Sequence, residues 1–276
     1  MEAVKEIKAK ARELLENGQV ECVIGYGLGS LKVRPAFAYT PAEVEQFVWN
    51  SNCNQNLVNY LNDKKDRKVA IVAKPCDVRA INVLIHENQV KRENVYIIGM
   101  ACPGMEWQGQ PEARCQHCDQ RVPVLYDALI GQAPDVSVAP DDYADVAALE
   151  SMPAEERLAF WAREFDRCIR CYACRQACFG CYCFECVAEQ LDPQWVSIAI
   201  DLPEKQLFHI MRAYHLAGRC VGCQECERVC PMGLPLSLLN RKIAKEMAEL
   251  FGGYRAGADA AVAPPLATFR KEEDLK

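Results

Sequence analysis

The chain has 276 residues and a formal net charge of −6; half of its residues are hydrophobic and 25% are charged. This length and composition are ordinary for a globular protein of two domains. An acidic balance without a basic tract argues against nucleic acid or an anionic membrane surface as a partner. No apolar run approaches the ~18 residues that a membrane-spanning helix needs, and the charged first residues do not resemble a signal peptide.

Cysteine is unusually frequent, with 17 in the chain. A secreted protein held together by disulfides would be shorter and would lack the regular spacing described below. We therefore interpret most of the thiols as metal ligands. This interpretation predicts a reducing, cytoplasmic location.

The chain begins with an amphipathic pattern. Apolar side chains recur at a helical period over residues 3–16, and a strand is predicted over residues 20–24. Gly25, Gly27 and Gly29 follow this strand. The G-x-G-x-G string resembles a dinucleotide fingerprint without its G-x-G-x-x-G spacing, so Gly25 and Gly27 are candidates for contact with a cofactor, and a tight loop is the alternative.

Helices and strands then alternate. The predicted elements are a helix starting at Pro41 behind a capping box, a helix over residues 54–62, a buried strand over 69–73, a helix over 78–86 and a buried strand over 95–100. Strands that alternate with helices indicate an α/β fold with a mostly parallel sheet. We assign this first domain to residues 1–130.

Cysteines follow two of these strands, at the sheet edge where open α/β sheets bind ligands. Cys76 comes after the first strand and near a helix start, where the helix dipole favours thiolate. Cys102 comes after the second. Cys115 and Cys118 form a later C-x2-C pair, which alone is a weak signal shared by zinc and cluster sites. With Cys76 and Cys102 the pair completes four thiolates for an iron–sulfur cluster.

A linker is predicted over residues 131–153, where Gly and Pro break any periodicity. Ser151 is expected to cap the next helix, whose aromatic residues lead into Cys168. The second domain is assigned to residues 154–253. An extended tail over residues 254–276 is expected to be disordered or to lie on a partner.

Two cysteine motifs define the second domain. Each has the spacing C-x2-C-x2-C-x3-C, which is typical of paired 4Fe–4S clusters in which the fourth cysteine ligates the other cluster. The first cluster is therefore assigned Cys168, Cys171, Cys174 and Cys230, and the second Cys220, Cys223, Cys226 and Cys178. The pattern indicates a protein that transfers electrons.

The motifs begin 52 residues apart, at Cys168 and Cys220, with helices predicted before, between and after them. This separation predicts a mainly α-helical dicluster ferredoxin domain and not a compact β-hairpin ferredoxin. Cys181, Cys183 and Cys186 follow the first motif. They are interpreted either as ligands of a further metal or as residues that line the path between clusters.

These features resemble a known family. Pro75-Cys76-Asp77 before a helix, the strand that ends at Cys102 and the pair Cys115-x2-Cys118 resemble the beta subunits of deazaflavin-coenzyme-reducing hydrogenases and formate dehydrogenases. The motif from Cys168 to Cys178 is similar to that of the formate dehydrogenase branch. The resemblance covers residues 20–130 and 165–235. It implies FAD and a 4Fe–4S cluster in the first domain, with Cys76, Cys102, Cys115 and Cys118 as cluster ligands and Cys53 in reserve.

The main hypothesis is an iron–sulfur electron-transfer subunit of a cytoplasmic complex of anaerobic metabolism, inactive alone. The complex would be a formate dehydrogenase, a hydrogenase or a heterodisulfide-reductase-like assembly. Electrons would pass between two clusters, a third cluster and a flavin. The flavin candidates are Gly25, Gly27, Lys74 and Asp77; the last two are equally well explained as solvated residues at a helix start. The alternative is a flavin-free adaptor that docks a redox partner.

Overall fold

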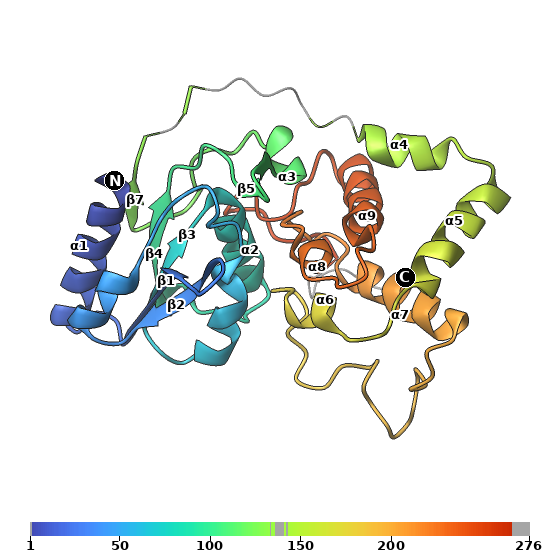
Figure 1. Ribbon diagram of the computed structural model, residues 1–276, viewed down its shortest axis with the longest axis horizontal. Helices are drawn as coiled ribbons and strands as arrows, with labels where there is room; N and C mark the ends of the chain where they lie inside the picture. The colour runs from blue at the N-terminus through green and yellow to red at the C-terminus, as the bar shows by residue number, and fades with distance from the viewer. Residues whose placement is uncertain (1, 133, 136–140, 142, 267–276) are drawn as a thin grey trace, which may run out of the picture. The chain divides into compact units, whose positions relative to one another are not determined.

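The computed structural model describes residues 2–132, 134–135, 141 and 143–266. The chain divides into two compact units, one made of residues 1–141 with 256–276 and the other of residues 142–255 (Figure 1). We call them the α/β unit and the helical unit and describe each by itself. In the part of the chain described, no helix is long and apolar enough to span a membrane.

The α/β unit is built on a five-stranded sheet in the order β2-β1-β3-β4-β7. Its strands are β1 (Cys22–Leu28), β2 (Val33–Ala38), β3 (Val69–Ala73), β4 (Val95–Met100) and β7 (Ala128–Ile130). β1, β3, β4 and β7 pair in parallel, and β2 pairs with β1 in antiparallel fashion. The predicted mostly parallel sheet is confirmed. Every residue of β3 is buried, as expected for a central parallel strand covered on both faces.

Helices cover the two faces of this sheet (Figure 1). Helix α1 (Glu2–Glu16) packs Ile7, Ala11 and Leu14 against strand residues such as Val72 and Ile98. The alternate strand residues point to the opposite face, which α2 (Pro75–His86) covers. The shorter elements of this unit are η1 (Pro41–Gln46), η2 (Leu57–Lys64), η3 (Arg92–Asn94), β5 (Glu106–Trp107), β6 (Gln110–Pro111) and α3 (Ala113–Gln116).

Helices dominate the other unit. They are α4 (Ala144–Glu150), α5 (Ala154–Asp166), α6 (Ala173–Gln176), α7 (Leu202–His215), α8 (Glu225–Arg228) and α9 (Leu236–Leu250). Asp201 caps α7 by accepting a hydrogen bond from the backbone N–H of Glu204 at 3.2 Å. The core packs Phe165 and Phe208 against Cys174 and Cys226. The predicted helical character of the dicluster region is confirmed.

Several predicted boundaries are wrong. Gly25 and Gly27 were expected in a loop but lie within β1. The two helices predicted near residues 41 and 54 are 3-10 helices. Helix α4 occupies part of the predicted linker, and Ser151 is the C-cap of α4 and not the N-cap of α5. Residues 133, 136–140 and 142 of that linker lie outside the described part of the chain.

The start of the predicted tail is bound by α2 of the same chain. Three side chains on one face of α2 contact tail carbonyl oxygens: Arg79 Nε donates to Ala256 at 2.9 Å, Asn82 Nδ2 donates to Gly257 at 3.1 Å and His86 Nε2 lies 3.0 Å from that of Ala260. A Cβ at Gly257 would lie 2.0 Å from the Arg79 carbonyl oxygen, so glycine permits this close approach. Residues 267–276, the rest of the predicted tail, are outside the described residues.

Candidate metal centres

The two cysteine motifs adopt the same backbone conformation. Arg170 and Tyr172 in the first motif have φ of 51° and 57°, and the equivalent Gly222 and Gln224 in the second have φ of 72° and 55°. Left-handed conformations are uncommon outside glycine and need support from their surroundings. Alternating right- and left-handed residues turn successive N–H groups inward and form concave sites for anions, including iron–sulfur clusters. Accordingly, the Arg170 N–H donates to Cys168 Sγ at 3.3 Å.

The first cysteine set surrounds a hollow. Its lining includes Cys168, Cys171, Cys174 and Cys230 together with apolar side chains such as Phe208. These are the four residues assigned to the first cluster from spacing alone. Burial raises the pKa of the Cys168 thiol; the hydrogen bond from the Arg170 N–H opposes the rise, and the neighbouring Cys230 and Cys171 add to it. Thiols held together in this way favour a cationic occupant such as iron, so the residues fit a cluster.

The second set is also brought together. Burial raises the pKa of Cys226 to about 12; Arg212 opposes this rise, while Cys178 and Cys220 add to it. Burial likewise raises the pKa of Cys223 well above its usual value, with contributions from Glu225, Cys178 and Cys220. All four assigned cysteines are therefore electrostatic neighbours, as a shared cluster requires.

Cys181, Cys183 and Cys186 have different surroundings. The thiols of Cys181 and Cys178 are hydrogen-bonded, which lowers the pKa of Cys181 and raises that of Cys178. Cys183 is exposed, and Cys186 packs against the core of the helical unit. Among the described residues, no three His, Cys, Asp or Glu side chains have the compact geometry of a single-ion site. A cubane cluster spreads its thiolates over four corners, so the absence of a compact single-ion site does not conflict with cysteine sets that hold clusters. The role of these three cysteines stays a prediction.

The third predicted set lies in the α/β unit. Burial raises the pKa of Cys76, and Asp77 and Cys102 add to the rise while Arg114 and Lys74 oppose it. Burial also raises the pKa of Cys102, whose neighbours include Cys115 and Cys118. The four cysteines are therefore linked through Cys102. Lys74 and Arg114 supply positive charge to the set, which fits an anionic cluster.

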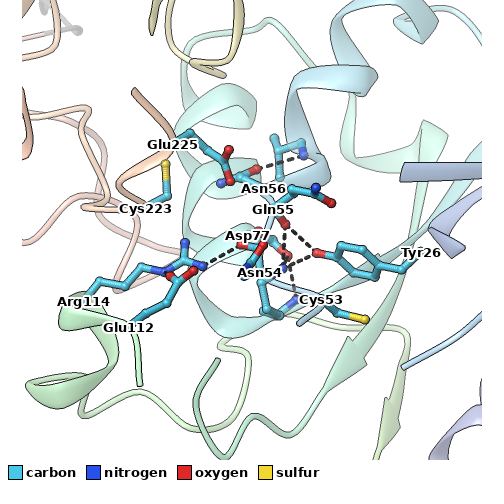
Figure 2. Close-up of polar contacts among 12 residues, drawn as sticks. Tyr26, Cys53, Asn54, Gln55, Asn56, Asp77, Glu112, Arg114, Cys223 and Glu225 are labelled. Carbon is cyan, nitrogen blue, oxygen red and sulfur yellow. Dashed lines mark hydrogen bonds and ion pairs between the residues drawn. The ribbon is translucent and has the colours of Figure 1, made fainter. Parts of the chain in front are cut away.

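Lys74 and Asp77 form a buried network with Tyr26 and Gln55; Figure 2 shows Tyr26, Gln55 and Asp77 lying close together. Both side chains have no exposed surface, and Lys74 Nζ lies 2.9 Å from Asp77 Oδ2. The ammonium also donates to the Gln55 carbonyl oxygen at 2.8 Å and to the Tyr26 hydroxyl. Asp77 Oδ2 accepts the Lys74 backbone N–H at 3.0 Å. These contacts join β1, the loop before η2 and the start of α2, so the alternative of solvated residues is wrong. Their role toward a flavin stays a prediction.

Gly25 and Gly27 have a packing role. A Cβ at Gly25 would lie 3.0 Å from the ring of Phe47, and one at Gly27 would lie 2.9 Å from the Cβ of Ala36. Both glycines therefore permit the close approach of β2 and of the segment after η1. Contact with a flavin is not needed to explain them. Cys53 also has a partner within the α/β unit, because its buried sulfur accepts a hydrogen bond from the Asn50 N–H at 3.3 Å.

The buried polar face of α7 was missed from sequence. Lys205, His209 and Arg212 are 6%, 1% and 5% exposed and share one helix face with Phe208. His209 stacks on Phe165 with ring centroids 4.9 Å apart, and its Nε2 lies 3.2 Å from Cys168 Sγ. Burial first, then Arg212 and Arg170, lower the pKa of His209 to about 4, so the ring is neutral. The signal in the sequence was three cationic or imidazole side chains at helical spacing between the motifs.

Comparison with known proteins agrees with this arrangement. Residues 167–235 match the family model for a 4Fe–4S dicluster domain. The chain is 23% identical to the F420-dependent formate dehydrogenase subunit beta of Methanocaldococcus jannaschii, over 78% of this chain and 79% of the relative. It is also 23% identical to the F420-dependent formate dehydrogenase 1 subunit beta of Methanococcus maripaludis, over 94% and 92%.

A more local similarity exists to the acetyl-CoA decarbonylase/synthase complex subunit alpha 1 of Methanosarcina mazei, 30% identical over 41% of this chain and 12% of that protein. The chain is thus a distant homologue of formate dehydrogenase beta subunits over most of its length. It is a 4Fe–4S dicluster electron-transfer subunit, and the dicluster domain implies two 4Fe–4S clusters. The resemblance stated from the sequence is confirmed.

Proposed function

We propose that this distant homologue of formate dehydrogenase beta subunits relays electrons between a partner redox subunit and a flavin that exchanges hydride with a deazaflavin coenzyme. The observation that carries the proposal is the pairing of eight motif cysteines into two sets of neighbours within a chain related to those subunits along most of its length. Both relatives are named F420-dependent, which supports a deazaflavin as the hydride carrier and formate oxidation as the activity of the complex.

We assign Cys168, Cys171, Cys174 and Cys230 to the first cluster and Cys220, Cys223, Cys226 and Cys178 to the second. The clusters would supply one-electron transfer. The chain's own residues hold the thiolates, exclude water and donate hydrogen bonds to sulfur. The exclusion of water is supported by Phe165 and Phe208, each 2% exposed. Thiolate ligands favour a reducing cytoplasm as the location.

In the α/β unit we assign Cys76, Cys102, Cys115 and Cys118 to a third cluster. Its anionic charge would be balanced by Lys74 and Arg114, whose positive charges oppose the pKa rise of Cys76. A bound FAD would convert single electrons into hydride. Four residues would then support the flavin site indirectly, through packing and ion pairing within the protein and without contacting the flavin: Gly25, Gly27, Lys74 and Asp77.

A flavin-free adaptor is the second candidate, and one observation favours it. The ammonium of Lys74 has three protein partners, Asp77, Gln55 and Tyr26, and an ammonium has three donors. It therefore has no donor left for a flavin. In this version the α/β unit docks a partner flavoprotein.

Anaerobic purification followed by iron, sulfide and flavin assays separates the candidates. About twelve irons per chain with FAD supports the main proposal, and about eight irons without flavin supports the adaptor, since each cubane holds four irons. A chain with no acid-labile sulfide would contradict both.

A further inference from the structure

Arg212 is a buried cation with an unusual set of partners. It lies on α7, the helix between the two cysteine motifs, and is 5% exposed. Its Nη2 donates to the Cys174 carbonyl oxygen at 3.2 Å, and its Nε has no hydrogen-bond partner among the described residues. In the described part of the chain, no carboxylate forms an ion pair with it.

The other buried cations of the helical unit are compensated differently. Arg175 pairs with Glu189 at 2.7 Å, Arg228 pairs with Glu225 at 2.6 Å and Lys205 lies 3.4 Å from Asp166. Arg170 donates to the carbonyl oxygens of Ser197 and Ala199 and to the Tyr172 hydroxyl. A buried guanidinium without an anion is strongly unfavourable. Arg212 therefore indicates that negative charge accumulates beside it from another source.

The two cysteine sets supply that charge when they hold clusters, because cysteine ligands are deprotonated on binding metal. The electrostatic neighbours of the Arg212 guanidinium are Cys226, Cys178, Cys174 and Cys181. Cys174 belongs to the first set, and Cys178 and Cys226 belong to the second. A hydrogen bond also joins the guanidinium to Cys226. The positive charge of Arg212 thus faces both candidate clusters. Its two largest electrostatic partners, Cys226 and Cys178, belong to the second.

We propose that Arg212 is a positioning residue shared by the two clusters, and that its fixed charge sets their reduction potentials. This inference rests on the proposed function, since it requires clusters at both cysteine sets. One-electron reduction adds one negative charge to a cluster whose thiolate-ligated core is already anionic. A neighbouring cation stabilises the reduced form more than the oxidised form. Arg212 therefore raises both potentials, and that of the second cluster more than that of the first.

The test is a redox titration of the full-length protein, followed by electron paramagnetic resonance under anaerobic conditions. The variants are Arg212→Gln, which removes the charge, and Arg212→Lys, which keeps it. Arg163→Gln is the control for the lost charge, because the Arg163 side chain on α5 is 65% exposed and solvent screens it.

In Arg212→Gln we expect both midpoint potentials to fall. At a fixed potential near the wild-type midpoint, the reduced-to-oxidised ratio of the second cluster should drop at least tenfold, equivalent to 59 mV for a one-electron couple. Arg212→Lys should recover most of this shift, and Arg163→Gln should leave both potentials unchanged. Equal potentials in wild type and Arg212→Gln, with both clusters present, would overturn the inference.

Loss of clusters in the variant is also informative. If Arg212→Gln loses only the second cluster, a lowered potential of the first supports the inference and an unchanged one overturns it. If it loses both, retention of both in Arg212→Lys supports a role for the charge, and their loss there overturns it. A wild-type protein without iron–sulfur clusters would instead contradict the proposed function.

Discussion

Lys74→Met is expected to destabilise the carboxyl edge of the parallel sheet. The Lys74 ammonium is fully buried and lies 2.9 Å from the Asp77 carboxylate. Removing one partner of a buried ion pair leaves the other charge uncompensated and costs about 3–5 kcal/mol. The substitution also removes one of the two donors to the Gln55 carbonyl oxygen, the ammonium at 2.8 Å, and leaves the Tyr26 hydroxyl at 2.6 Å.

Amide hydrogen exchange measured by mass spectrometry can test this prediction locally. A local method is needed because a protein of two units with cofactors is not expected to unfold in a single transition. A loss of about 3–5 kcal/mol predicts exchange in α2 that is faster by roughly a hundredfold to several thousandfold, since each 1.4 kcal/mol is a factor of ten. Peptides of the helical unit provide an internal control. The double variant Lys74→Met/Asp77→Asn removes both charges and should exchange more slowly than the single variant.

One outcome would refute this reasoning. If Lys74→Met leaves exchange in α2 unchanged while bound flavin is lost, then Lys74 contacts the flavin and does not hold the sheet edge. If exchange accelerates and flavin content stays the same, the buried network is structural.

Three further predictions concern the clusters and the tail. Cys226→Ser should remove one cluster signal from the electron paramagnetic resonance spectrum and leave exchange in the α/β unit unchanged; retention of every signal would contradict the ligand assignment. His209→Phe removes the contact of 3.2 Å to Cys168 Sγ and should lower the midpoint potential of the first cluster by roughly 20–60 mV, the equivalent of one hydrogen bond; an unchanged potential would show that the contact does not act on the cluster. Gly257→Ala places a Cβ against the Arg79 carbonyl oxygen and should release the tail, detected as faster proteolytic cleavage after residue 255; cleavage at the wild-type rate would contradict the docking.

Cysteine spacing carried most of the functional prediction. Ligands such as Cys168, Cys171 and Cys174 are close in sequence, so their spacing limits how they can surround a cluster before any tertiary contact forms. The fourth ligand of each set was placed by the regular exchange of cysteines between paired motifs. The structure then brought Cys230 to the first set and Cys178 to the second.

The glycines and Lys74 show where sequence reasoning was insufficient. Gly25 and Gly27 follow an apolar run and so looked like a loop, but pairing with β2 extends β1 through them. From the sequence, Lys74 was explained equally well as a flavin neighbour and as a solvated residue at a helix start. Its burial depends on Tyr26 and Gln55, which are 48 and 19 residues away along the chain. Periodicity within one segment contains no information on such contacts.

The sequence by itself determined the redox chemistry, the mostly parallel sheet and the helical character of the cluster region. These properties depend on local spacing and on the apolar pattern of individual strands and helices. Only the tertiary structure decided which charges face the thiolates. Arg212, a cation, and His209, a neutral ring, are ordinary residues of an amphipathic helix, and they gain a role because α7 buries that face against Cys174 and Cys168. Burial removes the solvent that would screen the charge of Arg212, so its electrostatic interaction with the neighbouring cysteines is stronger than at the surface.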